Sequence, residues 1–520
     1  MAGIFSSFNT ANKGLIAQQT ALQTASHNIS NANTEGFSRQ RVEMKASMSY
    51  NLNGVGQVGT GVKMEAIVRL IDEYVVGQIR EENGMLERFT AKSEVLEQLE
   101  IIFNEPSDTG LNFNIGQMFN AWQELGKNPE NLNSKTIVVE KAKTLADTLN
   151  HMAEQINSLK DDTVGQIEKN TYDFNALVDS LRDLNKQIFN ISVKGDVPND
   201  LLDQRDLMLK NLSSISDFDT SFDKYGQVSI SIGDKNITED VYEMSMVKDI
   251  KENEDGSFTV YISKGGDSLS DLVSYKAEDI TDLKIGEVIL NRKDEDFKDT
   301  EDVIFNPSIT SGKITGNIDA LSVIEERKEN LNAYAKTMAE AINKVHKYND
   351  EGIDFFTFEG AEENGEFAKF LKVNSEIQVN HSLVNAGKSP SSPEGDGSRA
   401  LAIARLKNTK LQFNNQSEDS FNYDPDTMTI EDQYGGITIE GAYIDIVTKV
   451  GIAKEHADNM VSNQGVLLDK LNLRKESTSG VSINEEVTNL IKYQKAFEAN
   501  AKVISVLSEM LDTLINRTGV

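Results

Sequence analysis

Glycines at three positions of the chain have the spacing of a phosphate-binding loop. Gly54, Gly56 and Gly59 satisfy the pattern G-x-G-x-x-G, in which backbone N–H groups cradle a pyrophosphate. That chemistry needs a buried strand before the first glycine and a helix that begins at the last one. Neither is expected here: residues 51–53 are largely polar, and a strand-like alternation follows the glycines at Val62, Met64, Ala66 and Val68. We therefore interpret the segment as a flexible glycine loop and not as a nucleotide site.

Side chains that ligate metals or activate nucleophiles are present but are not grouped. The acidic run 293–302 lacks the spaced ligands and the glycine of a calcium loop, and the nucleophile pattern G-x-S-x-G does not occur. The histidines lie far apart, without H-E-x-x-H or another metal-ligand spacing, at His27, His151, His346, His381 and His456. The sequence therefore predicts no catalytic residue, no metal site and no cofactor, in a protein that is not an enzyme.

Net charge limits the partners of the chain. Its 520 residues include 52 Lys and Arg against 83 Asp and Glu, a formal charge of -31 that repels nucleic acid and anionic membrane surfaces. We expect neither as a partner. Cysteine is absent, which excludes disulfides and thiolate metal sites. Residues 1–13 lack the basic and apolar segments of a cleavable signal peptide, and no apolar run is long enough to span a bilayer. Secretion would need another route.

The elements that could act are the two ends of the chain. Near the N-terminus, apolar residues recur every seven positions among polar ones, and the pattern stops at the turn-forming residues Asn31, Asn33 and Gly36. This stripe predicts an amphipathic helix. Its members are Phe8, Leu15, Leu22 and Ile29, with Phe5 before them.

The C-terminal stretch has a matching stripe, and Ser482 with Glu485 predicts a capping box at its start. Burial of so few apolar side chains does not offset the entropy of ordering about 30 residues. We therefore expect both ends to be disordered in the monomer and to fold on assembly, against each other and against neighbouring copies. The alternative is an ordinary hairpin of the two ends within one chain. The C-terminal stripe consists of Leu490, Phe497, Ile504 and Leu511.

Between the ends, further heptads predict long helices that pack as one rod-like bundle. Period-two alternation at Val228, Ile230 and Ile232, and at Phe258, Val260 and Ile262, predicts a β-rich insert. The fold class is thus mainly α with an inserted β-rich domain, in an elongated multi-domain protein. The helical heptads lie within 86–103, 145–191, 321–345 and 450–471.

Three domains follow from these patterns. Residues 1–45 plus 478–520 form a terminal helical domain, 46–216 plus 316–477 a helical bundle domain, and 217–315 a β-rich outer insert. Residues 352–440 are mixed and are a candidate sub-insert, with an exposed loop over 387–398 rich in Gly, Pro and Ser.

Two segments directly beside the terminal stripes resemble a known family. Residues 28–42 read NISNANTEGFSRQRV, which is similar to the N-terminal motif of the flagellar rod, hook and hook-associated proteins. The ending Ser38-Arg39-Gln40 is most similar to the hook-associated members. Residues 480–514 resemble the C-terminal motif of the same family, including Glu485-Glu486 and Ala499-Asn500. The two motifs cover about a sixth of the chain, and their joint occurrence at its extreme ends is more specific than either alone.

The resemblance implies a structural subunit of the bacterial flagellum. Members of the family pack their terminal helices into the inner tube of the axial structure and carry variable outer inserts. For this chain it implies polymerisation at the distal end of the hook, where a ring-like assembly of copies forms the hook–filament junction. Its partners would be further copies, the hook protein and hook-associated protein 3. It also implies an extracellular place in the flagellum and export by the flagellar type III system without a cleavable signal peptide.

Roles for single residues follow in the same way. A flagellar export chaperone binds the C-terminal helix in the family, which implies chaperone contacts at Leu490, Phe497, Ile504 and Leu511. We predict that Gly36 lets the chain leave the inner helix and that Phe37 anchors that turn.

Two rival interpretations stay open at this point. A hook or distal rod subunit shares the terminal motifs, although Phe37-Ser38-Arg39-Gln40 and the long helical stretch from Lys135 to Val193 argue against it. A surface hydrolase carried on an axial scaffold would need a site within 217–315 or 352–440, where no hydrolase motif occurs.

Overall fold

A computed structural model describes residues 2–52, 54, 56–103, 110–233, 235–239, 242–263, 273–277, 283–292, 303–304, 307, 309–348, 352–361 and 365–517. The chain forms two compact units. Unit 1 comprises Met1–Glu87, Lys169–Ile314 and Ser462–Val520, and unit 2 comprises Arg88–Glu168 and Thr315–Val461. The division into three domains stays a prediction. The acidic run 293–302 lies outside the described residues.

Four long helices contribute residues to both units: α2 (Glu73–Phe103), α4 (Leu132–Ser192), α6 (Gly312–His346) and α10 (Ile439–Ser479). Each contains one of the predicted heptad segments, so the mainly helical fold class is confirmed. On α10 the heptad spacing places Leu467 in the apolar stripe, and this was wrong, because Leu467 is exposed and its neighbour Leu468 is half-buried. An α-helix has 3.6 residues per turn and drifts away from a strict seven-residue repeat.

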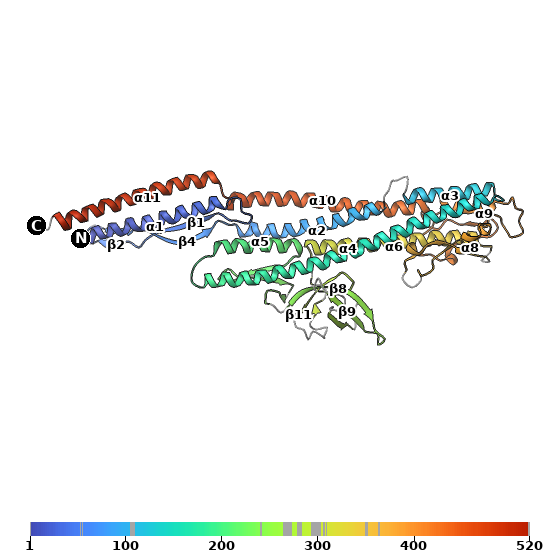
Figure 1. Ribbon diagram of the computed structural model, residues 1–520, viewed down its shortest axis with the longest axis horizontal. Helices are drawn as coiled ribbons and strands as arrows, with labels where there is room; N and C mark the ends of the chain where they lie inside the picture. Colours follow the sequence, from blue (N-terminus) through green and yellow to red (C-terminus); the bar gives the residue numbers. More distant parts are fainter. Residues whose placement is uncertain are drawn as a thin grey trace. The chain divides into compact units, whose positions relative to one another are not determined.

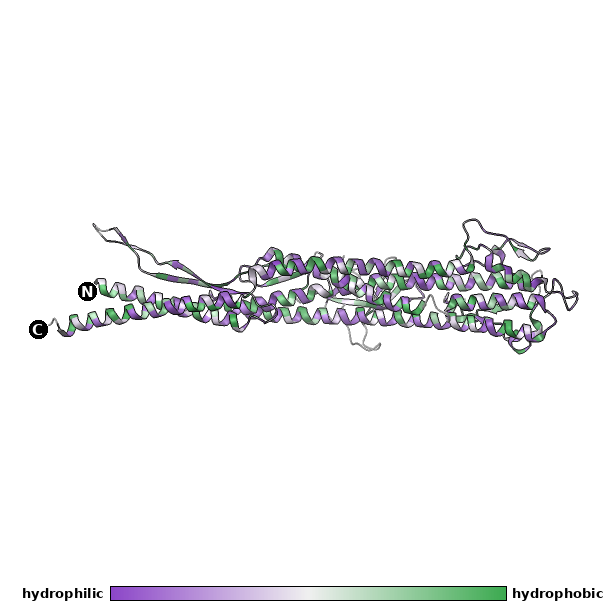
Figure 2. Ribbon diagram, turned by 90° about the horizontal axis from the view of Figure 1, so that it is seen from above, coloured by the Kyte–Doolittle hydropathy of each residue, from purple (hydrophilic) through white to green (hydrophobic). Residues whose placement is uncertain are grey.

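In unit 1, α1 (Ala2–Ser30) and α11 (Ile483–Asp512) lie side by side, and Figures 1 and 2 show the chain ends at the same end of this pair. The two helices are therefore antiparallel. After α1 the chain forms an antiparallel ladder of β1 (Gln40–Ala46) and β4 (Val62–Arg69). Helix α5 (Asn199–Ile215) packs against β4.

The glycine pattern lies between β1 and β4 in a small hairpin of β2 (Tyr50–Leu52) and β3 (Gly56–Val58). Gly54 is in the turn, and its φ is +84°. A strand, not a helix, follows the glycines, so the geometry of a pyrophosphate loop is missing here. Residues 51 and 52 belong to β2, which the sequence did not predict, because backbone pairing across the turn forms this strand without an apolar pattern.

The β-rich insert is confirmed and begins with a small sheet of β5 (Asp219–Phe222), β6 (Val228–Ile232) and β7 (Lys235–Asn236). Val228, Ile230 and Ile232 are buried, as their alternation predicts. A second sheet has the strand order β10-β9-β8-β11-β12. Its strands are β8 (Tyr242–Glu252), β9 (Phe258–Ser263), β10 (Val273–Ala277), β11 (Val288–Arg292) and β12 (Val303–Ile304).

Two asparagines of α4 attach the insert. Asn185 donates to Val228 O at 2.7 Å and accepts from Val228 N at 3.0 Å. Asn175 binds the backbone of Met244 in the same way, at 2.7 and 3.1 Å. Each amide thus replaces a neighbouring strand and satisfies backbone groups that the sheets leave unpaired.

An apolar core of unit 2 is formed by its parts of the long helices, by α3 (Leu111–Lys127) and by residues 352–446. The fully buried Trp122 of α3 meets Phe355 edge to face at 5.1 Å. Residues 352–440 form short elements of both kinds, as expected. These are β13 (Phe356–Thr357), α7 (Phe367–Phe370), β14 (Lys372–Val373), α8 (Ser375–Val379), α9 (Ser398–Arg405), β15 (Tyr423–Asp424) and β16 (Thr429–Ile430).

Candidate assembly site at the paired terminal helices

Small residues form the buried side of α1. A Cβ built on Gly14 would lie 2.9 Å from Asn500 Oδ1 of α11, so the two helices approach closely at this point. Glycine and alanine have small side chains, which allow a short distance between helix axes. The buried residues of α1 are Ala11, Ala17, Ala21, Thr24, Ala25 and Asn28.

The structure brings the two predicted stripes together on this helix pair, but it does not bury either of them fully. Phe5 is 52% exposed. The remaining members are half-buried: Phe8, Leu15, Leu22 and Ile29 on α1, and Leu490, Phe497, Ile504 and Leu511 on α11. The buried alanine side of α1 was missed because alanine gives only a weak hydrophobic signal in a sequence.

A second apolar side of α11 faces solvent. Val503, Val506 and Met510 are 47%, 45% and 53% exposed. Ala496 and Ala499 continue their alternating spacing of three and four residues towards the helix start. Residues at these spacings share one side of a helix, so this side, which we call the 503–510 face, runs beside the Leu490–Leu511 stripe. The spacing was present in the sequence and could have been found there.

Arg39 joins the turn after α1 to the first turn of α11. Its Nε donates to Glu486 Oε1 at 2.7 Å, and its Nη2 to Glu485 Oε1 at 2.9 Å. Its backbone N–H donates to Ser479 O at 2.9 Å. Burial lowers the pKa of Arg39, but the hydrogen bonds and charges of Glu485 and Glu486 outweigh it, so the pKa is raised overall. Arg39 is therefore charged at every physiological pH.

The capping box predicted at Ser482 and Glu485 was wrong. Ser482 is the N-cap residue, but its side chain makes no capping hydrogen bond. The Glu485 carboxylate binds Arg39 instead of the backbone N–H of Ser482. A hydrogen bond between two charged groups is stronger than one to a neutral amide, which accounts for this choice.

The turn over 31–39 has the geometry that its glycine requires. Gly36 has a φ of +81°, where a side chain is strained, and a Cβ there would lie 3.2 Å from Leu207 Cβ. The ring of Phe37 packs edge to face on His27 of α1, with 5.4 Å between ring centres. Asn33 is exposed. The turn is thus held against α1 on one side and α5 on the other.

Behind this turn, buried polar groups connect α1, β1 and α5. Asn28 Nδ2 donates to Gln40 O at 2.9 Å, and Asn28 Oδ1 accepts from Gln40 N at 3.0 Å. Asp203 of α5 accepts from the backbone N–H of Ser38 at 2.9 Å and pairs with Arg69 of β4 at 2.8 Å. Burial raises the pKa of Asp203, although Ser38 and Arg69 act against it.

No alternative chemistry stands out in the part of the chain that the structure describes. There, no cluster of His, Asp or Glu is large enough to hold a metal ion. Over the same residues, no helix combines the length and the apolar character that membrane crossing requires. The arrangement that remains is a pair of terminal helices with apolar residues at the surface and a polar anchor at its base.

Known flagellar proteins resemble the chain along its whole length. The Bacillus subtilis protein called "Flagellar hook-associated protein 1" is 28% identical to this chain, and the match covers 100% of this chain and 99% of the relative. The Escherichia coli protein of that name is 24% identical, with 98% of this chain and 99% of the relative covered. The Salmonella typhimurium protein of that name is 23% identical over 98% of this chain and 99% of its own.

Family models and one solved structure agree with these relatives. Residues 96–241 match the helical domain of flagellar hook-associated protein FlgK. Residues 8–37 match the flagella basal body rod protein family, and 476–517 the C-terminal family of the basal body rod FlgEFG proteins. The flagellar hook junction protein FlgK from Burkholderia pseudomallei shares the fold, with a TM-score of 0.54 and 14% identity over 77% of this chain and 100% of that one. These relatives match the chain from end to end and the rod families match both of its termini, so the chain is a homologue of the proteins named flagellar hook-associated protein 1.

Proposed function

We propose that this chain is a structural, non-enzymatic subunit that polymerises at the distal end of the hook and forms the hook–filament junction, on which the filament grows. One observation carries the proposal: the terminal helices pair with each other and still expose apolar side chains along α11. The names of the relatives support the same conclusion, as does the structural neighbour from Burkholderia pseudomallei, which is a flagellar hook junction protein.

The exposed side chains give assembly a driving force. Val503, Val506 and Met510 are each about half exposed, and covering apolar surface stabilises by ~25 cal/mol per Å². A neighbouring copy that covered the 503–510 face would bury all three at once. We propose that copies make this contact in a ring-like assembly, with the hook protein on one side and hook-associated protein 3 on the other. The roles of Phe5, Phe8, Leu15, Leu22 and Ile29 in polymerisation belong to the same proposal.

The same surface needs protection before assembly. Exposed apolar stripes promote aggregation or premature polymerisation. We propose that a flagellar export chaperone covers Leu490, Phe497, Ile504 and Leu511 inside the cell. The chain then leaves through the flagellar type III system with disordered ends, and these fold only when they reach the growing structure outside.

Deletion of the gene tests the junction role. Cells are examined by electron microscopy, and the medium is assayed for flagellin. We expect hooks without filaments and monomeric flagellin in the medium, with filaments restored by the gene in trans. Cells without hooks would instead identify a rod or hook subunit, and normal filaments would refute any junction role.

A further inference from the structure

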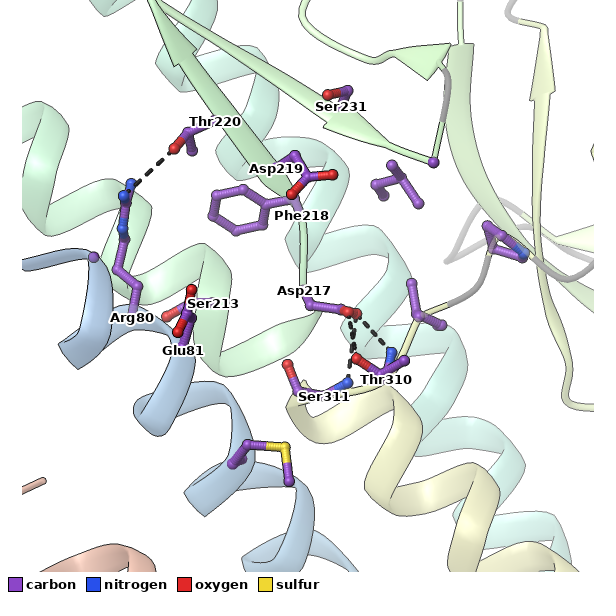
Figure 3. Close-up of a pocket in the computed structure, with 16 residues that line it drawn as sticks. Arg80, Glu81, Ser213, Asp217, Phe218, Asp219, Thr220, Ser231, Thr310 and Ser311 are labelled. Atoms are coloured by element: carbon purple, nitrogen blue, oxygen red, sulfur yellow. Dashed lines mark hydrogen bonds between the residues drawn. The ribbon is translucent and has the colours of Figure 1, made fainter. Parts of the chain in front are cut away.

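Unit 1 contains a cavity of about 630 Å³ at the base of the β-rich insert. Helix α2, the end of α5, strands β5 and β6 and the segment before α6 surround it (Figure 3). Its volume lies in the range of small-molecule sites, ~300–1,000 Å³. Hydroxyl groups are spread over its wall and can both donate and accept hydrogen bonds. They belong to Ser213, Thr220, Ser231, Thr310 and Ser311.

Arg80 is the cation of this cavity. Its Nη2 donates to Thr220 Oγ1 at 3.4 Å, and Figure 3 shows the side chain extending from α2 towards β5. Within the described parts of the chain this is its one hydrogen bond, and no carboxylate pairs with it there. Burial lowers the pKa of Arg80, and Arg205 acts in the same direction, while Asp206 and Glu81 oppose them. A guanidinium has five N–H donors, so Arg80 can donate to further oxygen atoms besides Thr220 Oγ1.

Carboxylates and one aromatic ring complete the lining. Asp217 already accepts from Thr310 N at 2.8 Å and from Thr310 Oγ1 at 2.7 Å. Asp219 and Glu81 are exposed, so their oxygens remain accessible as acceptors. Phe218 is half-buried, and its ring lies between Arg80 and Asp219 in Figure 3.

These groups discriminate between classes of ligand. Three carboxylates against one guanidinium give the lining a net negative charge, which disfavours an anion. Arg80 disfavours a simple cation, and a purely apolar molecule could not accept hydrogen bonds from the Arg80 guanidinium. A ligand with many hydroxyl groups satisfies donors and acceptors together, and its C–H face can cover an aromatic ring.

We propose that this cavity binds a neutral saccharide. Arg80 donates to sugar oxygens, Asp219 and Glu81 accept from sugar hydroxyls, and Phe218 packs on the face of the ring. The site would give the insert a binding function of its own, and it does not depend on the role of the terminal helices.

Saturation-transfer NMR on the full-length protein tests this proposal. The probes are glucose, galactose, mannose, N-acetylglucosamine and its dimer, with inorganic phosphate and free glutamate as charged competitors. We expect at least one saccharide to bind. Arg80→Ala should weaken it by about ten-fold or more, because hydrogen bonds from a charged donor are lost. Phe218→Leu should also weaken it, because the flat ring that covers the sugar face is removed. Arg80→Lys should also bind more weakly, because it lacks the planar fork of donors.

Matched controls keep the test decisive. Arg41 is an exposed arginine of β1 and Tyr172 an exposed aromatic residue of α4, and neither lines the cavity. Arg41→Ala and Tyr172→Leu should bind as the parent does, and thermal melting should show that every variant is folded. Failure of all saccharides to bind would overturn the proposal. So would equal weakening in the controls, or binding of phosphate or glutamate alone through Arg80.

Discussion

Arg39 Nε lies 2.7 Å from Oε1 of Glu486, a residue that is only 3% exposed, so the turn after α1 neutralises a buried charge in the first turn of α11. The two residues are 447 positions apart in the sequence. Ordering of one chain end therefore depends on the presence of the other.

Replacement of Arg39 by Met should destabilise the assembled form. Loss of one partner of a buried ion pair leaves the other charge uncompensated, at a cost of ~3–5 kcal/mol when both are fully buried. Because the Arg39 side chain is 17% exposed, we expect the assembled form to lose a smaller amount of stability, about 2 kcal/mol per subunit. This loss is measured as a lower dissociation temperature of polymers of the purified chain. Arg41→Met is the control, and Arg39→Met with Glu486→Leu should recover part of the loss. An unchanged dissociation temperature would refute the coupling.

A valine at Gly36 should block assembly but leave most of the chain folded. The backbone there has a φ of +81°, and an added Cβ would press on Leu207. A β-branched residue tolerates that conformation poorly, so the turn must rearrange. We expect loss of filaments with a thermal melting curve close to that of the parent. Gly59→Val is the matched control, because a Cβ at Gly59 meets nothing within 4 Å. Normal filament growth in Gly36→Val would show that this turn does not matter.

Polar substitution on the 503–510 face separates assembly from stability. Val506 and Met510 are about half exposed, so Val506→Ser with Met510→Gln removes little buried surface from the monomer. We expect an unchanged melting temperature together with weaker polymerisation, measured by sedimentation. Val379→Ser, at an exposed position of α8, controls for loss of surface hydrophobicity. Polymerisation as strong as that of the parent would assign the subunit contact to another surface.

The state of the chain ends before assembly is accessible to NMR. We expect sharp amide signals at random-coil shifts for residues 2–30 and 483–512 in the monomer, because the stripes on both helices are at most half-buried. Protected amides at these positions would instead establish an ordinary intramolecular hairpin.

Two titratable groups of unit 2, the buried His346 and the half-buried Glu340, predict opposing pH effects. Burial lowers the pKa of His346 to about 4. Between about pH 6.5 and pH 4 the histidine is therefore protonated in the unfolded state but neutral in the folded state. Its contribution to stability is therefore lost as the pH falls from about 6.5 to 4. Burial also raises the pKa of Glu340 to about 7, so its contribution is lost as the pH rises from about 4.5 to 7.

The two effects offset each other in the parent chain and separate in variants. We expect the stability of His346→Gln to decrease, relative to the parent, as the pH rises from 4.5 to 6.5, and that of Glu340→Gln to increase. The difference should be on the order of 2 kcal/mol over that range for His346→Gln, and smaller for Glu340→Gln, because solvent screens the partly exposed carboxylate. Calorimetric melting at three pH values measures these slopes. Parallel curves for all three proteins would show that neither group titrates as described.

Much of the helical architecture could be predicted because its signal is local and periodic. Leu145, Leu149 and Ile156 repeat with helical spacing, and all three are buried on α4. Alternation at Val228, Ile230 and Ile232 identified β6 for the same reason. Patterns of this kind depend only on the period of one element and on which of its sides is covered.

Contacts between distant residues could not be predicted. Ser482 and Glu485 fit a local capping pattern, but Arg39 binds Glu485 from the other end of the chain. Arg399 shows the same limit in the mixed segment: it is almost fully buried, and its guanidinium donates to Gly387 O and Lys388 O and to the carbonyls of Val345 and Lys347 at the end of α6. Such bonds fix irregular segments without leaving any period in the sequence.

The contacts at the base of the helix pair also determine how a pulling force would pass through the molecule. A load applied along α1 reaches β1 through the peptide chain of the turn and through the two hydrogen bonds between Asn28 and Gln40. A load on α11 reaches the same turn through the ion pairs of Arg39. These connections act in parallel, so tension is shared among them and must break several at once, which makes the base of the pair stiffer than either helix alone.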